Sequence, residues 1–264
     1  MKSLFISLVT LFFFLGTSFG QENFKVIKVN GSILLRVKNV SLQTGTVFSE
    51  KEDLLFRSDD ATAAVINSQK GRLILTANNH DLSKIQANYL PAMYNVSTRG
   101  GSLSNVFDLQ NHFSGKYVVL DKHKIVMDTE AFPMDEDHFF YLQYVYKGEE
   151  IPKKLGYSGD TLLIDKKNLY TVDGQPIPGP DNPSIKLFYL NGNKTKLPIS
   201  EFNLIFPDTK QLKEEIKIIL DTMKNLPSKD QVGEVTAYIY DQYGKIQRDN
   251  LIAWMKVNLG FQMK

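Results

Sequence analysis

The chain has 264 residues, a formal net charge of +2 at pH 7 and no cysteine. Without cysteine it cannot form a disulfide, a cysteine nucleophile, an iron–sulfur cluster, a thiolate zinc site or an acylated N-terminal anchor. A nearly neutral chain without a basic stripe has no broad attraction for nucleic acid or anionic lipid, and we expect neither as a partner.

The first twenty residues have the pattern of a secretory signal. Lys2 is followed by an apolar run from Leu4 to Leu15, and small residues precede Gln21. This pattern predicts a signal peptide over residues 1–20, cleaved between Gly20 and Gln21, and a periplasmic or secreted protein. The run is shorter than the roughly 20 residues of a membrane span, so we expect no span or lipid anchor. A buried N-terminal helix is the alternative.

Residues 21–100 are predicted to form a small all-β domain. Lys25–Val29 and Ser32–Val37 alternate around the Asn30-Gly31 pair, which is typical of a hairpin turn. Further short strands are expected at Thr46–Phe48, Asp53–Arg57, Ala61–Ile66 and Arg72–Thr76. Many short, closely spaced strands favour a small barrel or sandwich. A connection follows over residues 78–104, with at most a short helix at Leu82–Tyr89.

The order of motifs in this region resembles a known family. The segments that carry the resemblance are Val26–Ile33, Leu42–Gly45, Asp53–Phe56, Ala61–Val65 and Gly71–Leu75. In this order they resemble the FecR-type β-domain of bacterial envelope proteins, over residues 24–76. The resemblance implies a β-domain located in the envelope. The whole chain resembles uncharacterised exported bacterial proteins that share this N-terminal module.

Residues 101–206 are predicted to form a second β-rich region. Strands are expected at Lys116–Leu120, Lys124–Met127 and Phe139–Tyr146, and a turn at Ser158–Asp160. The Asn191-Gly192 pair predicts a hairpin between Ile185–Leu190 and Thr195–Ile199. The segment Pro176–Pro183 holds four prolines and is expected to be a stiff, exposed loop.

Residues 207–264 change to a helical period. Leu212, Ile216 and Ile219 share one face of a helix that Asp208 and Gln211 are expected to cap. A second helix follows Pro227, capped by Ser228 and Gln231, and a third is expected near Asp249–Leu259. The predicted fold class is therefore α+β, mainly antiparallel, with a C-terminal cluster of about three short helices.

Several motifs resemble sites but fail on inspection. Asp135–His138 could hold a metal ion, although consecutive residues point in different directions and a solvated turn is the preferred interpretation. Asp241–Asn250 lacks the ligands of a calcium loop, Gly156–Asp160 lacks the setting of a hydrolase nucleophile, and Gln43–Gly45 lacks the protease aspartate. The histidines His80, His112, His123 and His138 are expected on the surface or in turns. We therefore predict no catalytic, cofactor-binding or metal-binding residue.

The strand Phe139–Tyr146 carries aromatic residues on both faces. Either the C-terminal helices cover one face, which is the preferred interpretation, or that face is an aromatic binding surface. Tyr238, Tyr240, Tyr243 and Trp254 would belong to the covering layer. The leading functional hypothesis is an exported, non-catalytic interaction or scaffold protein whose partner is another envelope protein. The alternatives are an Asp/Glu-dependent hydrolase acting on glycan or peptide, and a ligand-binding sensor.

Overall fold

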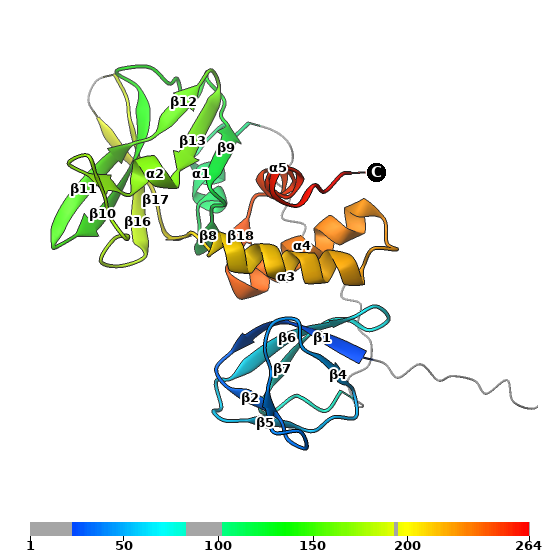
Figure 1. Ribbon diagram of the computed structural model, residues 1–264. Coiled ribbons are helices and arrows are strands. Elements are labelled where there is room, and N and C mark those ends of the chain that lie inside the picture. Colours follow the sequence, from blue (N-terminus) through cyan, green and yellow to red (C-terminus); the bar gives the residue numbers. More distant parts are fainter. Residues whose placement is uncertain (1–22, 83–101, 193–194, 264) are drawn as a thin grey trace, which may run out of the picture. The chain divides into compact units, whose positions relative to one another are not determined.

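The computed structural model describes residues 23–82, 102–192 and 195–263 (Figure 1). The chain divides into two compact units, Met1–Tyr89 and Leu90–Lys264. The described residues are rich in strands that pair mostly antiparallel, and they include five helices. The predicted α+β class is therefore confirmed. The predicted signal peptide, its cleavage site at Gly20 and Gln21, and nearly all of the short helix expected at Leu82–Tyr89 lie outside the described residues.

The first unit contains two sheets. Four strands, in the order β4-β1-β6-β7, are β1 (Asn23–Asn30), β4 (Val47–Ser49), β6 (Thr62–Asn67) and β7 (Gly71–Thr76). Three more, in the order β3-β2-β5, are β2 (Ile33–Leu35), β3 (Val40–Ser41) and β5 (Leu54–Phe56). One cluster of buried side chains takes members from both sheets, including Phe24, Val65, Ile33 and Leu54. Burial of this shared core holds the two sheets together.

The hairpin predicted at Asn30-Gly31 is not formed. β1 pairs with β4 and β6, whereas β2 pairs with β3 and β5, so this turn carries the chain from one sheet to the other. Gly31 has φ +76°, and a Cβ there would lie 3.0 Å from the Cβ of Ala61. The Asn-Gly pair specifies a sharp turn, but packing of the following strand into the shared core selects its partners.

The second unit contains two larger sheets and one strand pair. The six-stranded sheet has the order β11-β10-β16-β17-β8-β18, and the three-stranded sheet has the order β12-β13-β9. The strands of the first are β8 (Lys116–Val118), β10 (Phe139–Tyr146), β11 (Glu149–Lys154), β16 (Ser184–Leu190), β17 (Lys196–Ile205) and β18 (Lys245–Ile246). Those of the second are β9 (Lys122–Val126), β12 (Gly156–Ser158) and β13 (Thr161–Asp165), and the pair is β14 (Thr171–Val172) with β15 (Gln175–Pro176).

One hydrophobic core lies between the two larger sheets of this unit. It includes Phe140 and Leu187 from the six-stranded sheet and Ile164 from the three-stranded sheet. The helix α1 (Val106–His112) adds Leu109, and α2 (Lys166–Leu169) adds Leu169. β11 is followed almost directly by β12, so a single stretch of chain joins both sheets. Between the two strands, the Leu155 N–H donates to the Phe140 carbonyl on β10.

Two turns predicted from the sequence in this unit are confirmed. β16 and β17 form the hairpin that contains Asn191-Gly192, with Leu190 opposite Lys196. β12 and β13 meet at the Gly159 turn, with Ser158 opposite Thr161.

The strands β8 and β9 do not pair with each other. β8 lies parallel to β17 and β18, and β9 lies antiparallel to β13. The turn between them therefore moves the chain from one sheet to the other.

The predicted proline-rich loop is held in place by an aspartate. The Asp181 carboxylate accepts hydrogen bonds of 2.9 Å from the Lys147 and Gly148 N–H groups at the tip of the β10–β11 hairpin. The Asp181 N–H donates to the Val145 carbonyl at 2.8 Å. The two backbone N–H donors lower the pKa of Asp181. The loop is thus fastened to the hairpin next to it.

The C-terminal helices are α3 (Thr209–Thr222), α4 (Ser228–Gln242) and α5 (Arg248–Leu259). The Asp208 carboxylate caps α3 by accepting from the Gln211 N–H at 2.7 Å, as predicted. The predicted cap of α4 is wrong. Its N-cap residue is Pro227, without a side-chain hydrogen bond, because Ser228 already lies inside the first turn and its hydroxyl is directed to the Gln262 carbonyl.

Contacts from two elements, β18 and α5, join these helices to the sheets. β18, between α4 and α5, pairs with β8, and a Cβ on Gly244 would lie only 2.5 Å from the Cβ of Lys116. The Asn250 amide accepts from the Lys124 N–H and donates to its carbonyl, both at 2.9 Å, as a neighbouring strand would. The Trp254 indole donates to Asp121 at 3.0 Å.

Candidate functional site

The two faces of β10 have different surroundings. Phe140, Leu142 and Tyr144 point into the core of the second unit, so Phe139 and Tyr141 lie on the opposite, outward face. The expectation that the C-terminal helices cover a face of β10 is not met. Of the described residues in that core, none comes from α3, α4 or α5, and Figure 1 shows these helices beside β8 and β18, away from β10 and β11. Alternation shows that both faces are apolar but does not specify what covers them.

The strand register places a compact group of side chains on the outward face. Across four strands, Lys154, Tyr141, Phe188 and Pro198 lie opposite one another in one row. The neighbouring row contains Phe139, Leu190 and Lys196, because directly opposed residues point to the same side of a sheet. We call the apolar members of these rows the aromatic face. They are Phe139, Tyr141, Phe188, Leu190 and Pro198.

The rings of the aromatic face pack against one another. Tyr141 and Phe188 are stacked, with ring centroids 5.1 Å apart and planes 10° apart. Phe139 lies 6.3 Å from Tyr141, and the Lys154 ammonium sits 4.0 Å from the centre of the Phe139 ring. Stacking covers one face of each of these two rings, and Lys154 covers a face of Phe139, so fewer ring faces remain for a sugar to contact. The geometry therefore suits a side-chain partner better than a flat glycan.

Tyr141 is the most buried member of the aromatic face. It is 6% exposed, and its hydroxyl has no hydrogen-bond partner among the described residues. Burial raises the pKa of this hydroxyl. Phe139, Phe188 and Leu190 are partly exposed, and Pro198 with both flanking lysines is exposed. The patch is thus a semi-exposed apolar surface with a cation on each side.

The edges of the large sheets are protected against pairing with another chain. The Leu155 N–H donates to β10, so by alternation the backbone N–H groups of residues 154, 152 and 150 point to the free edge of β11. Residue 152 is a proline and has no N–H to donate there. β17 is an inner strand, but β8 pairs only with Asn203–Ile205, so the first half of β17 has an open side. The Asn191 N–H donates to the Thr195 carbonyl just before β17, and by the same alternation the backbone nitrogen of Pro198 points away from β16 to that open side. The edge of β9 is occupied at Lys124 by the Asn250 amide. These edges therefore do not favour strand addition.

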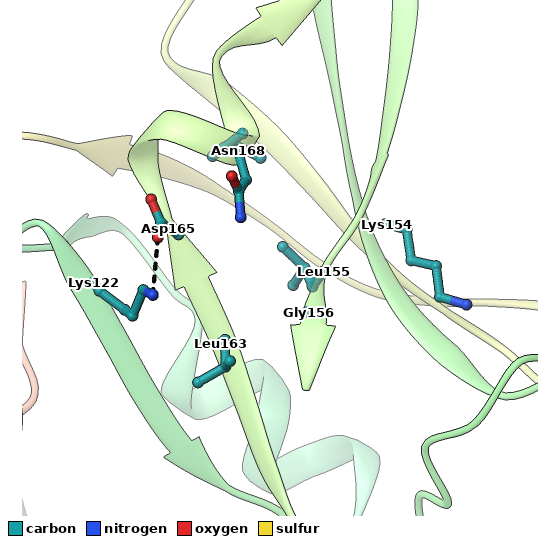
Figure 2. Close-up of a pocket in the computed structure, with 8 residues that line it drawn as sticks. Lys122, Lys154, Leu155, Gly156, Leu163, Asp165 and Asn168 are labelled. Atoms are coloured by element: carbon teal, nitrogen blue, oxygen red, sulfur yellow. Dashed lines mark ion pairs between the residues drawn. The ribbon is translucent and has the colours of Figure 1, made fainter. Parts of the chain in front are cut away.

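A cleft lies where β11 turns into β12 (Figure 2). Its lining residues are Lys122, Lys154, Leu155, Gly156, Leu163, Asp165, Asn168 and Leu169, around a volume of about 70 Å³. The ion pair between Lys122 and Asp165, at 3.1 Å, is drawn in Figure 2.

The cleft does not favour the hydrolase alternative. Pockets for small molecules typically hold about 300–1,000 Å³, and acid–base hydrolysis of glycans needs two carboxylates. Asp165 is the one carboxylate among the lining residues described. It is already committed to Lys122 and to the Lys167 N–H at 3.0 Å.

The Asp135–His138 cluster forms a local turn. The Asp135 carboxylate accepts from the N–H groups of Asp137 and His138 and lies 2.9 Å from the His138 Nδ1. These contacts with His138, and those with the backbone, lower the pKa of Asp135. In the described residues no three His, Asp or Glu side chains are grouped as a metal site would need. This arrangement is the solvated turn that the sequence favours.

The other rejected motifs lie in separate places. Gln43–Gly45 belongs to the first unit, where the Gln43 N–H donates to the Thr46 hydroxyl. Gly156–Asp160 is the β12–β13 turn, and Asp241–Asn250 runs from the end of α4 through β18 into α5. Within the second unit, Gly156–Asp160 and Asp241–Asn250 therefore belong to different elements.

Two histidines expected on the surface are buried. His112 is 5% exposed, His123 is fully buried, and the Tyr117 ring lies between them. The Tyr117 hydroxyl lies 2.7 Å from the His112 Nε2, and the His123 Nε2 accepts from the Leu120 N–H at 3.2 Å. The alternation of β9, with His123 between Lys122 and Lys124, was the available signal for burial of His123.

Burial keeps both histidines neutral. Burial, with a smaller effect of the nearby Lys245 ammonium, lowers the pKa of His112 to about 4. Burial and His112 lower the pKa of His123 to about 3. The Nδ1 atoms of both rings have no hydrogen-bond partner among the described residues. These rings are therefore poor general bases at neutral pH but sensitive to acid.

Comparison with known proteins adds no assignment. No protein-family model matches this sequence, and no curated protein matches it. Within the described residues, no helix is long and apolar enough to cross a membrane.

Proposed function

We propose that this protein is an exported, non-catalytic interaction protein of the bacterial envelope, periplasmic or secreted, and that its aromatic face binds another envelope protein. The observation that carries the proposal is the stacked Tyr141–Phe188 pair on the outward side of the six-stranded sheet. Aromatic residues flanked by exposed charges are typical of the centre of a protein interface. The apolar run at Leu4–Leu15 supports export.

We propose that the partner binds through side-chain contacts rather than by adding a strand to a sheet. Pro152 removes a donor from the β11 edge, and Pro198 removes one from the side of β17 that β8 leaves open, so a strand from a partner would leave its own acceptors unpaired there. The aromatic face has no such barrier. It offers an apolar centre whose burial provides the binding free energy.

We also propose a finer architecture and a relationship. Two sheets around one core support a small sandwich or partly open barrel for the first unit. The C-terminal helices form a separate layer on β8 and β18. For a FecR-type β-domain over residues 24–76, the supporting observation is that Gly31, Gly45 and Gly71 all have positive φ. These glycines belong to the FecR-type motif pattern, and positive φ is a backbone conformation that favours glycine over other residues.

Site-specific photo-crosslinking in the producing cell tests this function. A benzophenone amino acid replaces Phe188 in the full-length protein, and the control replaces Phe107, which is 70% exposed on α1. We expect a discrete crosslinked species from position 188 and none from position 107. An absence of crosslinks at 188, or the same pattern from both positions, would refute the proposal. N-terminal sequencing of the mature protein tests export, with Gln21 expected as its first residue.

A further inference from the structure

The surroundings of the aromatic face indicate the chemistry of its partner. We propose that the occupant is a protein segment with an apolar centre and a carboxylate on each side, the two carboxylates about 13 Å apart. This inference rests on the proposed function and specifies its partner. It follows from the charges on the outward face, from the packing of the rings and from the spacing of the strands.

Cations lie on both sides of the aromatic face. Lys154 on β11 ends one row of side chains, and Lys196 on β17 ends the next. Both are exposed, and the Lys154 ammonium sits over the Phe139 ring. A partner that buried the apolar centre would bring its flanking groups close to these ammonium ions. Carboxylates at those places would gain favourable contacts, whereas lysines would be repelled.

The rings supply the apolar centre of the face. Tyr141 and Phe188 stack within 10° of parallel, so each covers one face of the other, and the Lys154 ammonium lies over the Phe139 ring. A partner would therefore meet this cluster with an apolar side chain that lies between its charged groups.

The strand positions of the two lysines set the spacing. Lys154 and Lys196 are separated by three inter-strand gaps of about 4.8 Å and by one row, about 7 Å, along the strands, so their backbones lie about 16 Å apart. The Lys154 side chain leans inward over the Phe139 ring, which brings its ammonium closer to Lys196. In an extended chain, residues four positions apart are separated by about 13 Å and lie on the same side. The fitting segment is therefore extended, with an acidic residue, an apolar residue two positions on and a second acidic residue two positions further.

The same face argues against an anionic membrane as the occupant. The next row beyond Phe188 pairs Lys186 with Glu201, and the following row includes Glu150 on β11. A uniformly negative membrane surface would be repelled by both carboxylates. A segment with two separate carboxylates meets the lysines and avoids Glu201 and Glu150.

The test uses the full mature chain and a fluorescent nine-residue peptide. The peptide has glutamates at its third and seventh positions, phenylalanine at the fifth, and serine or threonine elsewhere. The comparison peptide has lysines in place of the glutamates, and vesicles of anionic phospholipid form a third arm. Binding is measured by fluorescence anisotropy for peptides and by sedimentation for vesicles. The matched variants are Lys154→Glu with Lys196→Glu, and Lys224→Glu with Lys229→Glu. Lys224 is exposed in the turn after α3, and Lys229 is exposed in the first turn of α4.

We expect the acidic peptide to bind about tenfold more tightly than the basic one, and the preference to weaken with salt. The variant at Lys154 and Lys196 should reverse the preference, and the variant at Lys224 and Lys229 should retain it. Equal binding of both peptides, binding of neither, or binding to vesicles alone would each overturn the inference. If crosslinking from position 188 still captured a protein, the proposed function would stand and only the partner chemistry would be wrong.

Discussion

Acid should destabilise the second unit through its two buried histidines. An unfolded histidine has a pKa near 6.5, whereas burial lowers the pKa of His112 to about 4 and that of His123 to about 3. The unfolded chain therefore binds more protons than the folded chain below pH 6.5. The stability is fully present above that pH and is lost as the pH falls. At pH 5 each histidine lowers the free energy of unfolding by about 2 kcal/mol relative to neutral pH, which gives about 4 kcal/mol for the pair.

The structure explains why protonation cannot be accommodated. The His123 Nε2 accepts the Leu120 N–H, so a proton on Nε2 would remove that hydrogen bond and leave a buried cation. His112 lies near the Lys245 ammonium, whose own pKa is lowered by burial. The aromatic rings of Tyr117 and Phe202 pack in this region, and neither can form an ion pair with a new positive charge.

Urea unfolding between pH 7.5 and pH 5 measures this effect. Trp254 is the single tryptophan of the chain and bonds to Asp121 in the turn next to His123, so its fluorescence reports on the second unit. The range from pH 7.5 to pH 5 also separates the effect of histidine protonation on stability from that of carboxylate protonation. The lowered pKa values of Asp135 and Asp181 mean that their stabilisation is lost only as the pH falls below their usual value of 3.8.

Near pH 5 the free energy of unfolding should change with a slope that approaches two protons, or about 3 kcal/mol per pH unit. Replacing both rings, as His112→Gln with His123→Gln, should remove most of the slope. If that variant does not fold, NMR titration of the wild-type histidines provides a second test, because neither ring should gain a proton above pH 5. A slope below about half a proton, or titration of both rings near pH 6.5, would refute the reasoning.

Three substitutions test the C-terminal helices, two of them through contacts with the sheets and one through a helix cap. Each is measured by urea unfolding followed through Trp254 fluorescence. Gly244→Ala should cost about 2 kcal/mol or more, because its φ is +130° and a Cβ would collide with Lys116; a neutral result would show that β18 does not need this close approach. Asn250→Ala should cost about 1–3 kcal/mol by removing both hydrogen bonds to the Lys124 backbone, and unchanged stability would contradict the edge contact. Asp208→Ala should cost about 1 kcal/mol through loss of the α3 cap, with lower helicity by circular dichroism; a gain in stability would argue against capping.

Local pattern in the sequence was sufficient for several features. The limits of the strand Phe139–Tyr146, the Asn191-Gly192 hairpin and the Asp208 cap all follow from short-range chemistry. Each depends on residues a few positions apart, whose spacing is the same in the sequence and in the fold. The apolar character of both faces of β10 follows in the same way.

For the candidate site, the sequence supplied the aromatic residues but not their setting. Alternation placed Phe139 and Tyr141 on one face of a strand, whereas the stacking partner Phe188 lies 47 positions beyond Tyr141, on β16. The flanking Lys154 and Lys196 come from two further strands. Register between strands depends on which cores they share, and that is a property of the whole unit.

By itself, the sequence determined the α+β class, the positions of most elements and the residues that punctuate them, because these depend on neighbours along the chain. Only the tertiary structure decided that Asn30-Gly31 links two sheets, that His112 is buried, and that the C-terminal helices pack at β8 and β18 rather than over β10. These outcomes depend on competition between distant apolar surfaces for the same core. The free energy of that competition is set by three-dimensional packing rather than by spacing along the chain.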